Sequence, residues 1–83
     1  MDFERVMYEI ENELVNASKY PDFHSLHEGY AVLFEEVEEL WDWVKCKPMK
    51  RDSKKIHNEC LQIAAMAIKI IDSLEKYNYN REV

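Results

Sequence analysis

Apolar residues recur every three or four positions over three segments of this chain, and short polar stretches separate the segments. The first such segment covers about residues 2–18. Its apolar positions are Phe3, Val6, Met7, Ile10, Leu14 and Ala17. This spacing is typical of one face of an α-helix. Pro21 follows the segment and cannot continue a helix, so a first amphipathic helix is predicted to end before it.

The start of a second helix is indicated by Ser25 and Glu28, which have the spacing of a capping box. In that motif the serine hydroxyl accepts a hydrogen bond from the backbone N–H three residues on, and the glutamate reaches back to the N–H of the serine. The helical pattern that follows extends over about residues 26–45, shortly before Pro48. A second helix over this range is therefore predicted.

A third helix is predicted over about residues 53–77, with Asp52 or Ser53 as its cap. The remaining residues, 78–83, are polar and are expected to fray. The chain has 83 residues, one glycine and two prolines, and little alternation of β-branched residues. These features predict a single all-α domain over residues 1–83, built from three helices.

On a helical wheel, the second helix presents one broad apolar face, which we expect to be its core face. This face comprises Leu26, Tyr30, Leu33, Phe34, Val37, Leu40, Trp41 and Val44. One flank of it holds Glu35 and Glu38, which are expected to lie in solvent. The other flank holds Glu36 and Glu39 beside a glycine, a valine and Trp43. Acids on such a half-buried face need a partner.

The third helix is apolar on nearly all sides. Its expected core stripe is Ile56, Cys60, Ile63, Ala64, Ala67, Ile70, Ile71 and Leu74, and its polar strip is Glu59, Gln62, Met66, Lys69 and Ser73. A helix that is apolar on opposite sides must be buried against more than one neighbour. Because a domain of this length buries a smaller fraction of its surface than a larger one and is marginally stable on its own, we expect the protein to be an obligate oligomer.

Charge and cysteine content restrict the possible partners and compartments. The net charge is −6 without a basic stripe, so a nucleic acid polymer is a poor partner. The longest apolar run, residues 60–71, is too short to cross a membrane and contains Gln62 and Lys69. The two cysteines cannot form a disulfide framework, and the first residues lack the pattern of a signal peptide. A cytoplasmic location is expected.

The acidic positions have the spacing of a metal site. Glu36 and Glu39 lie one helical turn apart, and Glu59 and Gln62 repeat this spacing on the next helix. Oxygen ligands in such an arrangement suit a hard divalent cation such as Mg²⁺ or Mn²⁺. Two simpler interpretations remain open at this stage. The glutamates of the second helix can be solvated surface residues, and Glu59 can form a structural ion pair with Lys69.

At these residues the sequence resembles a known family. Residues 27–42, followed by residues 58–67, are similar to the MazG-like, all-α nucleoside triphosphate pyrophosphohydrolases, and the resemblance covers about residues 23–74. That family is marked by E-x-x-E on one helix and E-x-x-D on the next. Here Glu36 and Glu39 fit the first half.

The second half of the motif begins at Glu59, but Gln62 stands where the family pattern has aspartate. The resemblance implies hydrolysis of a nucleoside triphosphate to a monophosphate and pyrophosphate. It further implies a Mg²⁺ ion, or Mn²⁺, held by Glu36, Glu39, Glu59 and Gln62. It also implies a homodimer or homotetramer in which the helices of several chains pair into a bundle.

Roles for further residues follow from the resemblance together with charge. Glu35, the acid that precedes the motif, or Glu36 is expected to orient or deprotonate the attacking water. Cationic side chains are expected to offset the charge of the phosphates. The candidates are Lys69, Lys45 and Lys55. Trp43 is the tryptophan expected to contact the substrate or a second subunit.

Two other functions fit the same residues. One is a non-catalytic helical module for dimerisation or interaction, in which Gln62 has weakened or removed the hydrolase activity. The other is a related chemistry on the same scaffold, such as phosphoribosyl-ATP pyrophosphohydrolase activity. Metal binding separates the first alternative from the hydrolase, and a panel of substrates separates the second.

Overall fold

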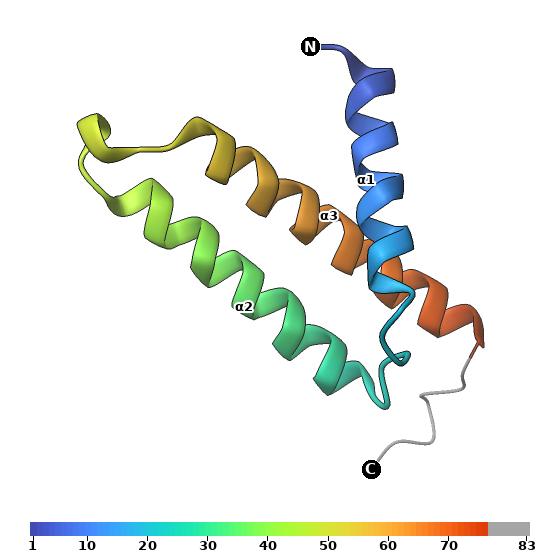
Figure 1. Cartoon of the computed structure of the whole chain (residues 1–83). Helices are drawn as coiled ribbons and strands as arrows, with labels where there is room; N and C mark the ends of the chain where they lie inside the picture. The colour runs from blue at the N-terminus through green and yellow to red at the C-terminus, as the bar shows by residue number, and fades with distance from the viewer. Residues whose placement is uncertain (77–83) are drawn as a thin grey trace.

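The computed structural model of the protein describes residues 1–76. Figure 1 shows three helices, α1 (Phe3–Ala17), α2 (Leu26–Lys45) and α3 (Ser53–Lys76), and a short 3-10 turn, η1 (Pro48–Lys50). The predicted all-α class is confirmed for the described residues, and the first two helices agree with their predicted ranges to within one residue. The predicted end of the third helix at residue 77 and the tail 78–83 lie outside the described residues.

The first two helices begin at side-chain caps. The carboxylate of Asp2 accepts a hydrogen bond from the backbone of Arg5 at 3.1 Å. At the start of α2, the hydroxyl of Ser25 accepts from the backbone N–H of Glu28 at 3.0 Å, as predicted. The carboxylate of Glu28 accepts from the N–H of His24 at 3.2 Å, one residue before the predicted donor. These contacts satisfy N–H groups that a helix cannot pair internally.

Of the two residues that were candidates for capping α3, Asp52 forms the cap. Its carboxylate oxygen Oδ1 accepts from the backbone N–H groups of Lys54 and Lys55 at 3.0 and 3.2 Å. The preceding residue, Arg51, donates from Nε and Nη2 to the carbonyl oxygen of Val44 at 3.1 and 2.8 Å. Arg51 thereby satisfies a carbonyl near the end of α2, and it ties that end to the start of α3.

The helices α2 and α3 run antiparallel and side by side, and α1 crosses α3 (Figure 1). Phe23, in the segment that joins α1 to α2, is 6% exposed and forms part of the core. Gly29 lies where α2 approaches both Phe23 and Ile70 of α3. Within residues 1–76, no helix is long and apolar enough to cross a membrane.

In a single chain the predicted core faces of α2 and α3 are only partly covered. On α2, Tyr30, Phe34 and Trp41 are 64%, 46% and 58% exposed. On α3, Ile71 and Leu74 are 56% and 51% exposed, whereas Leu61 and Ala65, on the opposite side of the helix, are buried. The half-buried flank with the acidic residues faces the other helices instead. A helical wheel locates the most apolar face, but it does not show which face a neighbouring helix covers.

Substituting Gly29 with valine is expected to destabilise the fold by about 2 kcal/mol because the core has no room for the added atoms. A Cβ atom at this position would lie 3.1 Å from Cγ1 of Ile70 and 3.1 Å from Cδ2 of Phe23. Thermal unfolding measures the effect. Ala31→Val, on an exposed position of the same helix, is the control and should change stability by less than about 0.5 kcal/mol. Equal stability of the two variants would contradict this packing.

Candidate functional site

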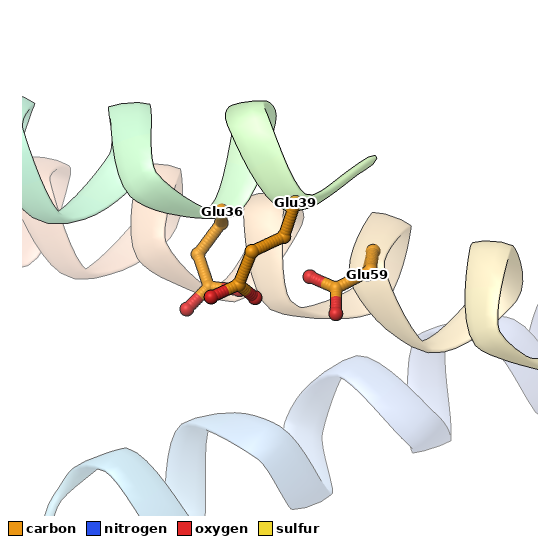
Figure 2. A group of neighbouring side chains, drawn as sticks. All are labelled: Glu36, Glu39 and Glu59. Carbon is orange, nitrogen blue, oxygen red and sulfur yellow. The ribbon is translucent and has the colours of Figure 1, made fainter. Parts of the chain in front are cut away.

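Three carboxylates from two helices meet at one place in the fold. Glu36 and Glu39 extend from α2 and Glu59 extends from α3, and each offers an oxygen within 4.8 Å of the others. Figure 2 shows the carboxylate of Glu59 turned toward the other two, in the space between α2 and α3 and on the side where α1 lies. The spacing of one helical turn places Glu36 and Glu39 on the same face, and the antiparallel pairing of α2 and α3 brings Glu59 opposite them. We call these three residues the carboxylate cluster.

The cluster raises the pKa values of Glu36 and Glu39 because negative charges this close together repel one another. Burial raises the pKa of Glu36 from 4.5 to about 7, and the adjacent carboxylates of Glu59 and Glu39 act in the same direction. The pKa of Glu39 is also raised, first by the charge of Glu59 and then by desolvation. Without a counter-ion, the folded protein therefore keeps protons on this cluster at pH values where isolated carboxyl groups are ionised.

Two oxygens of the cluster lie in unfavourable surroundings when the carboxylates are ionised. Oε2 of Glu36 and Oε2 of Glu59 are closed off from solvent and have no hydrogen-bond donor within the described residues. Buried charged oxygens without a donor are costly. All donor atoms of the cluster are hard oxygens with a combined negative charge, so the residues present fit Mg²⁺ or Mn²⁺.

A pocket of about 400 Å³ adjoins the cluster and includes Glu36 in its wall. It lies between α1, the segment that joins α1 to α2, and the α2–α3 pair. Two other residues predicted for the site, Gln62 and Lys69 of α3, also line it. The middle of the polar strip predicted on α3, namely Gln62, Met66 and Lys69, is therefore part of the wall of this pocket, and Glu36 belongs both to the pocket and to the cluster.

Lys69 contacts the segment between α1 and α2. Its Nζ atom donates to the carbonyl oxygen of Pro21 at 3.2 Å and lies 4.7 Å from the centroid of the Phe23 ring. Within residues 1–76, no ion pair joins Lys69 to Glu59. The interpretation of Glu59 as one half of a structural ion pair with Lys69 is therefore wrong. The Lys69 ammonium group remains at the wall of the pocket.

The other residues predicted for the site belong neither to the cluster nor to the pocket wall. Glu35 is exposed and does not belong to the cluster. Lys45 forms an ion pair with Asp42 at 3.0 Å on the surface of α2. Nζ of Lys55 lies 5.6 Å from the ring centroid of Trp43, so these two side chains contact each other. None of the four predicted residues, Glu35, Lys45, Lys55 and Trp43, lines the pocket that adjoins the cluster.

The contribution of α1 to the site was missed in the sequence. Glu13 and Asn16 line the pocket, and Glu9 contacts His57 of α3 at 2.7 Å. The hydrogen bond with His57 lowers the pKa of Glu9. Glu9 and Glu13 resemble any other acid on the polar side of an amphipathic helix, and 48 residues separate Glu9 from His57. No signal in a single sequence distinguishes them.

Comparisons of this chain with protein families, with curated proteins and with solved structures find no match. The resemblance to the MazG-like family therefore rests on the sequence pattern alone, in which Glu36, Glu39 and Glu59 fit the motif and Gln62 departs from it. Any assignment of function depends on what the carboxylate cluster and the adjoining pocket can do chemically.

Proposed function

We propose that this protein hydrolyses a nucleoside triphosphate to a nucleoside monophosphate and pyrophosphate with the help of a divalent cation. The observation that carries the proposal is the meeting of Glu36, Glu39 and Glu59 within 4.8 Å at the edge of a pocket of about 400 Å³. A site that combines a cation-binding cluster with a pocket for an organic group suits a substrate with both a polyphosphate and a base. The motif shared with MazG-like enzymes points to the same reaction.

The cation, Mg²⁺ or Mn²⁺, would be held by Glu36, Glu39 and Glu59. Gln62, one turn after Glu59 on the wall of the pocket, adds an amide oxygen without charge. A bound divalent cation supplies Lewis-acid polarisation of the phosphate oxygens. Mg²⁺ usually takes only a few protein ligands and completes its coordination with water and substrate phosphates, so three carboxylates are sufficient.

Two residues of the pocket, Glu36 and Lys69, are proposed to act on the attacking water and on the leaving pyrophosphate. Of the two acids proposed to position the attacking water, Glu36 lies at the pocket and Glu35 does not. We therefore assign this role to Glu36. Lys69 is the one of the three proposed lysines that lines the pocket, and its ammonium group can turn from the carbonyl of Pro21 toward a phosphate. Its positive charge offsets the charge of the leaving pyrophosphate.

Release of pyrophosphate from a panel of canonical and modified ribo- and deoxyribonucleoside triphosphates tests the proposal, with Mg²⁺ and with EDTA. Phosphoribosyl-ATP belongs in the panel because the related pyrophosphohydrolase activity remains an alternative. We expect turnover of at least one nucleoside triphosphate that depends on Mg²⁺. If no substrate is turned over in the presence of Mg²⁺ or Mn²⁺, the proposed hydrolase activity is wrong.

We further propose that two copies of the chain pair through the exposed apolar faces of α2 and α3. The apolar face of α2 consists mainly of Tyr30, Phe34, Val37, Trp41 and Val44, and that of α3 includes Ile71 and Leu74. Large contiguous apolar surface on a small domain indicates an interface. Pairing two copies of the α2–α3 hairpin gives a four-helix bundle with the α1 helices outside it. A homotetramer is the alternative assembly.

Replacing Val37 and Trp41 together with glutamate is expected to dissociate this assembly because both side chains lie on its apolar face and are 41% and 58% exposed in the single chain. Analytical ultracentrifugation at micromolar concentration reports the mass, and circular dichroism reports whether the monomers keep their helices. The control, Ala31→Glu, adds a charge at an exposed position on the flank of the same helix. A wild-type protein that sediments as a folded monomer would contradict the prediction.

The same apolar face favours the second candidate function, a non-catalytic helical module that pairs with itself or with another protein. The two functions differ in their dependence on metal. The interaction module needs no cation, so a protein that pairs through this face but neither binds Mn²⁺ in calorimetry nor releases pyrophosphate would be such a module. The carboxylate cluster favours the hydrolase because an interaction module has no use for three acids held this close together, two of them half-buried.

A further inference from the structure

The wall that α1 contributes to the pocket contains a polar pair. Glu13 and Asn16 lie one helical turn apart and both line the pocket. Neither side chain makes a hydrogen bond to another residue within the described part of the chain, and Glu13 is half-buried. Apolar residues from the other two helices, Val32 and Met66, lie in the same walls. The pocket therefore offers apolar surface together with two side chains whose hydrogen-bonding groups are available to a ligand.

The charge of this pocket decides which part of a nucleotide it can accept. Glu13, Glu28 and Glu36 contribute carboxylates, whereas Lys69 contributes the one ammonium group among the lining residues. An anionic pocket repels a bare polyphosphate, so the phosphates belong at the cation held by the cluster. A nucleobase is neutral and flat, and its edge carries hydrogen-bonding groups. The base is therefore the part of the substrate that fits beside the α1 wall of the pocket.

We propose, on the basis of the function proposed above, that Glu13 selects nucleobases that carry an exocyclic amino group. An ionised carboxylate only accepts hydrogen bonds. It can accept from the amino group of cytosine or adenine, but it repels the carbonyl oxygen that uracil or hypoxanthine has at the corresponding position. Asn16 both donates and accepts, so it can pair with the adjacent ring nitrogen. The specificity of the enzyme is thus for amino-bearing bases over their oxo analogues.

Two matched pairs of substrates test this selection, CTP with UTP and ATP with ITP, because the members of each pair differ in the amino or oxo group and the protonation of the neighbouring ring nitrogen. We expect kcat/KM to favour the amino member of a hydrolysed pair by about tenfold or more. In Glu13→Gln the ratio should fall toward one, because the amide can rotate to donate to a carbonyl oxygen. Glu11→Gln, at an exposed position of α1 that does not line the pocket, is the control and should keep the ratio.

The outcomes separate this inference from the hydrolase itself. If the wild type hydrolyses both members of each pair equally, the proposed selection of amino-bearing bases by Glu13 is wrong, but the proposed hydrolase activity is supported. Calorimetric binding of CMP and UMP tests the selection without turnover, and a preference for CMP that Glu13→Gln removes supports it. If neither monophosphate binds and no triphosphate is hydrolysed, both the inference and the proposed function are overturned.

Discussion

Replacing Glu36, Glu39 or Glu59 with glutamine is expected to lower Mg²⁺-dependent pyrophosphate release by at least about a hundredfold. Each substitution removes one of the three carboxylates that approach within 4.8 Å, and with it a negative charge that would hold the cation. The glutamine side chain is nearly the same size, so the loss reports charge and not packing. Steady-state rates over a range of Mg²⁺ concentrations measure the effect, and calorimetry with Mn²⁺ shows whether binding of the cation is lost with the activity.

The matched control for this series is Glu38→Gln. Glu38 lies on α2 between two members of the carboxylate cluster in the sequence, but it is exposed and lies on the opposite flank of the helix. This variant loses the same charge from the same helix and should keep nearly full activity. An inactive Glu38→Gln together with an active Glu36→Gln would show that α2 presents a different face to the substrate.

In the absence of divalent cations, the protein is expected to be more stable at pH 5 than at pH 8. The pKa of Glu36 is about 7 in the folded protein and 4.5 in its ordinary state, so the folded state binds this proton more tightly. The free energy of unfolding therefore decreases as the pH rises from about 4.5 to about 7. The raised pKa of Glu39 acts in the same direction. The full shift in the pKa of Glu36 corresponds to a change of about 3 kcal/mol in the free energy of unfolding. Because the side chain is only partly buried, screening by solvent reduces the expected change to about 2 kcal/mol.

Thermal unfolding in EDTA at pH 5 and pH 8 measures this difference, which corresponds to about 10 °C in Tm for a domain of this size. The comparison does not go below pH 5 because the pKa of Glu9 is lowered, so the stabilising contribution of Glu9 is lost as the pH falls below about 4.5. Added Mg²⁺ or Mn²⁺ should raise the Tm because a cation that binds to the folded state stabilises it. The increase should be larger at pH 8 than at pH 5, because at pH 5 protons compete with the cation for the carboxylate of Glu36.

The variant Glu36→Gln connects this stability effect to the proposed site. The amide is neutral at every pH, so the variant in EDTA should be more stable than the wild type at pH 8 and should show a weaker dependence on pH. Loss of activity together with gain of stability is the expected behaviour of a residue that serves a site and not the fold. A variant that is less stable than the wild type at pH 8 in EDTA would show that the Glu36 carboxylate supports the fold instead.

Local features of the sequence were sufficient to predict the helices. Ser25 and Asp52 are residues whose short polar side chains accept from the N–H groups of a helix start, and both do so in the structure. Because capping and helical periodicity involve residues only three or four positions apart, they can be read without knowledge of the tertiary fold. The same periodicity placed Glu36 and Glu39 on one flank of α2 and Glu38 on the other.

The sequence by itself thus determined the secondary structure and the grouping of residues on each helix, including the acids that meet in the carboxylate cluster. Only the tertiary structure decided which faces are covered. Tyr30 and Trp41 lie on the most apolar face of α2 but are exposed, and Glu13 of α1 lies at the pocket, with no local pattern to indicate it. The physical reason is that periodicity fixes the direction of a side chain about its own helix axis, whereas burial depends on which other helix packs there.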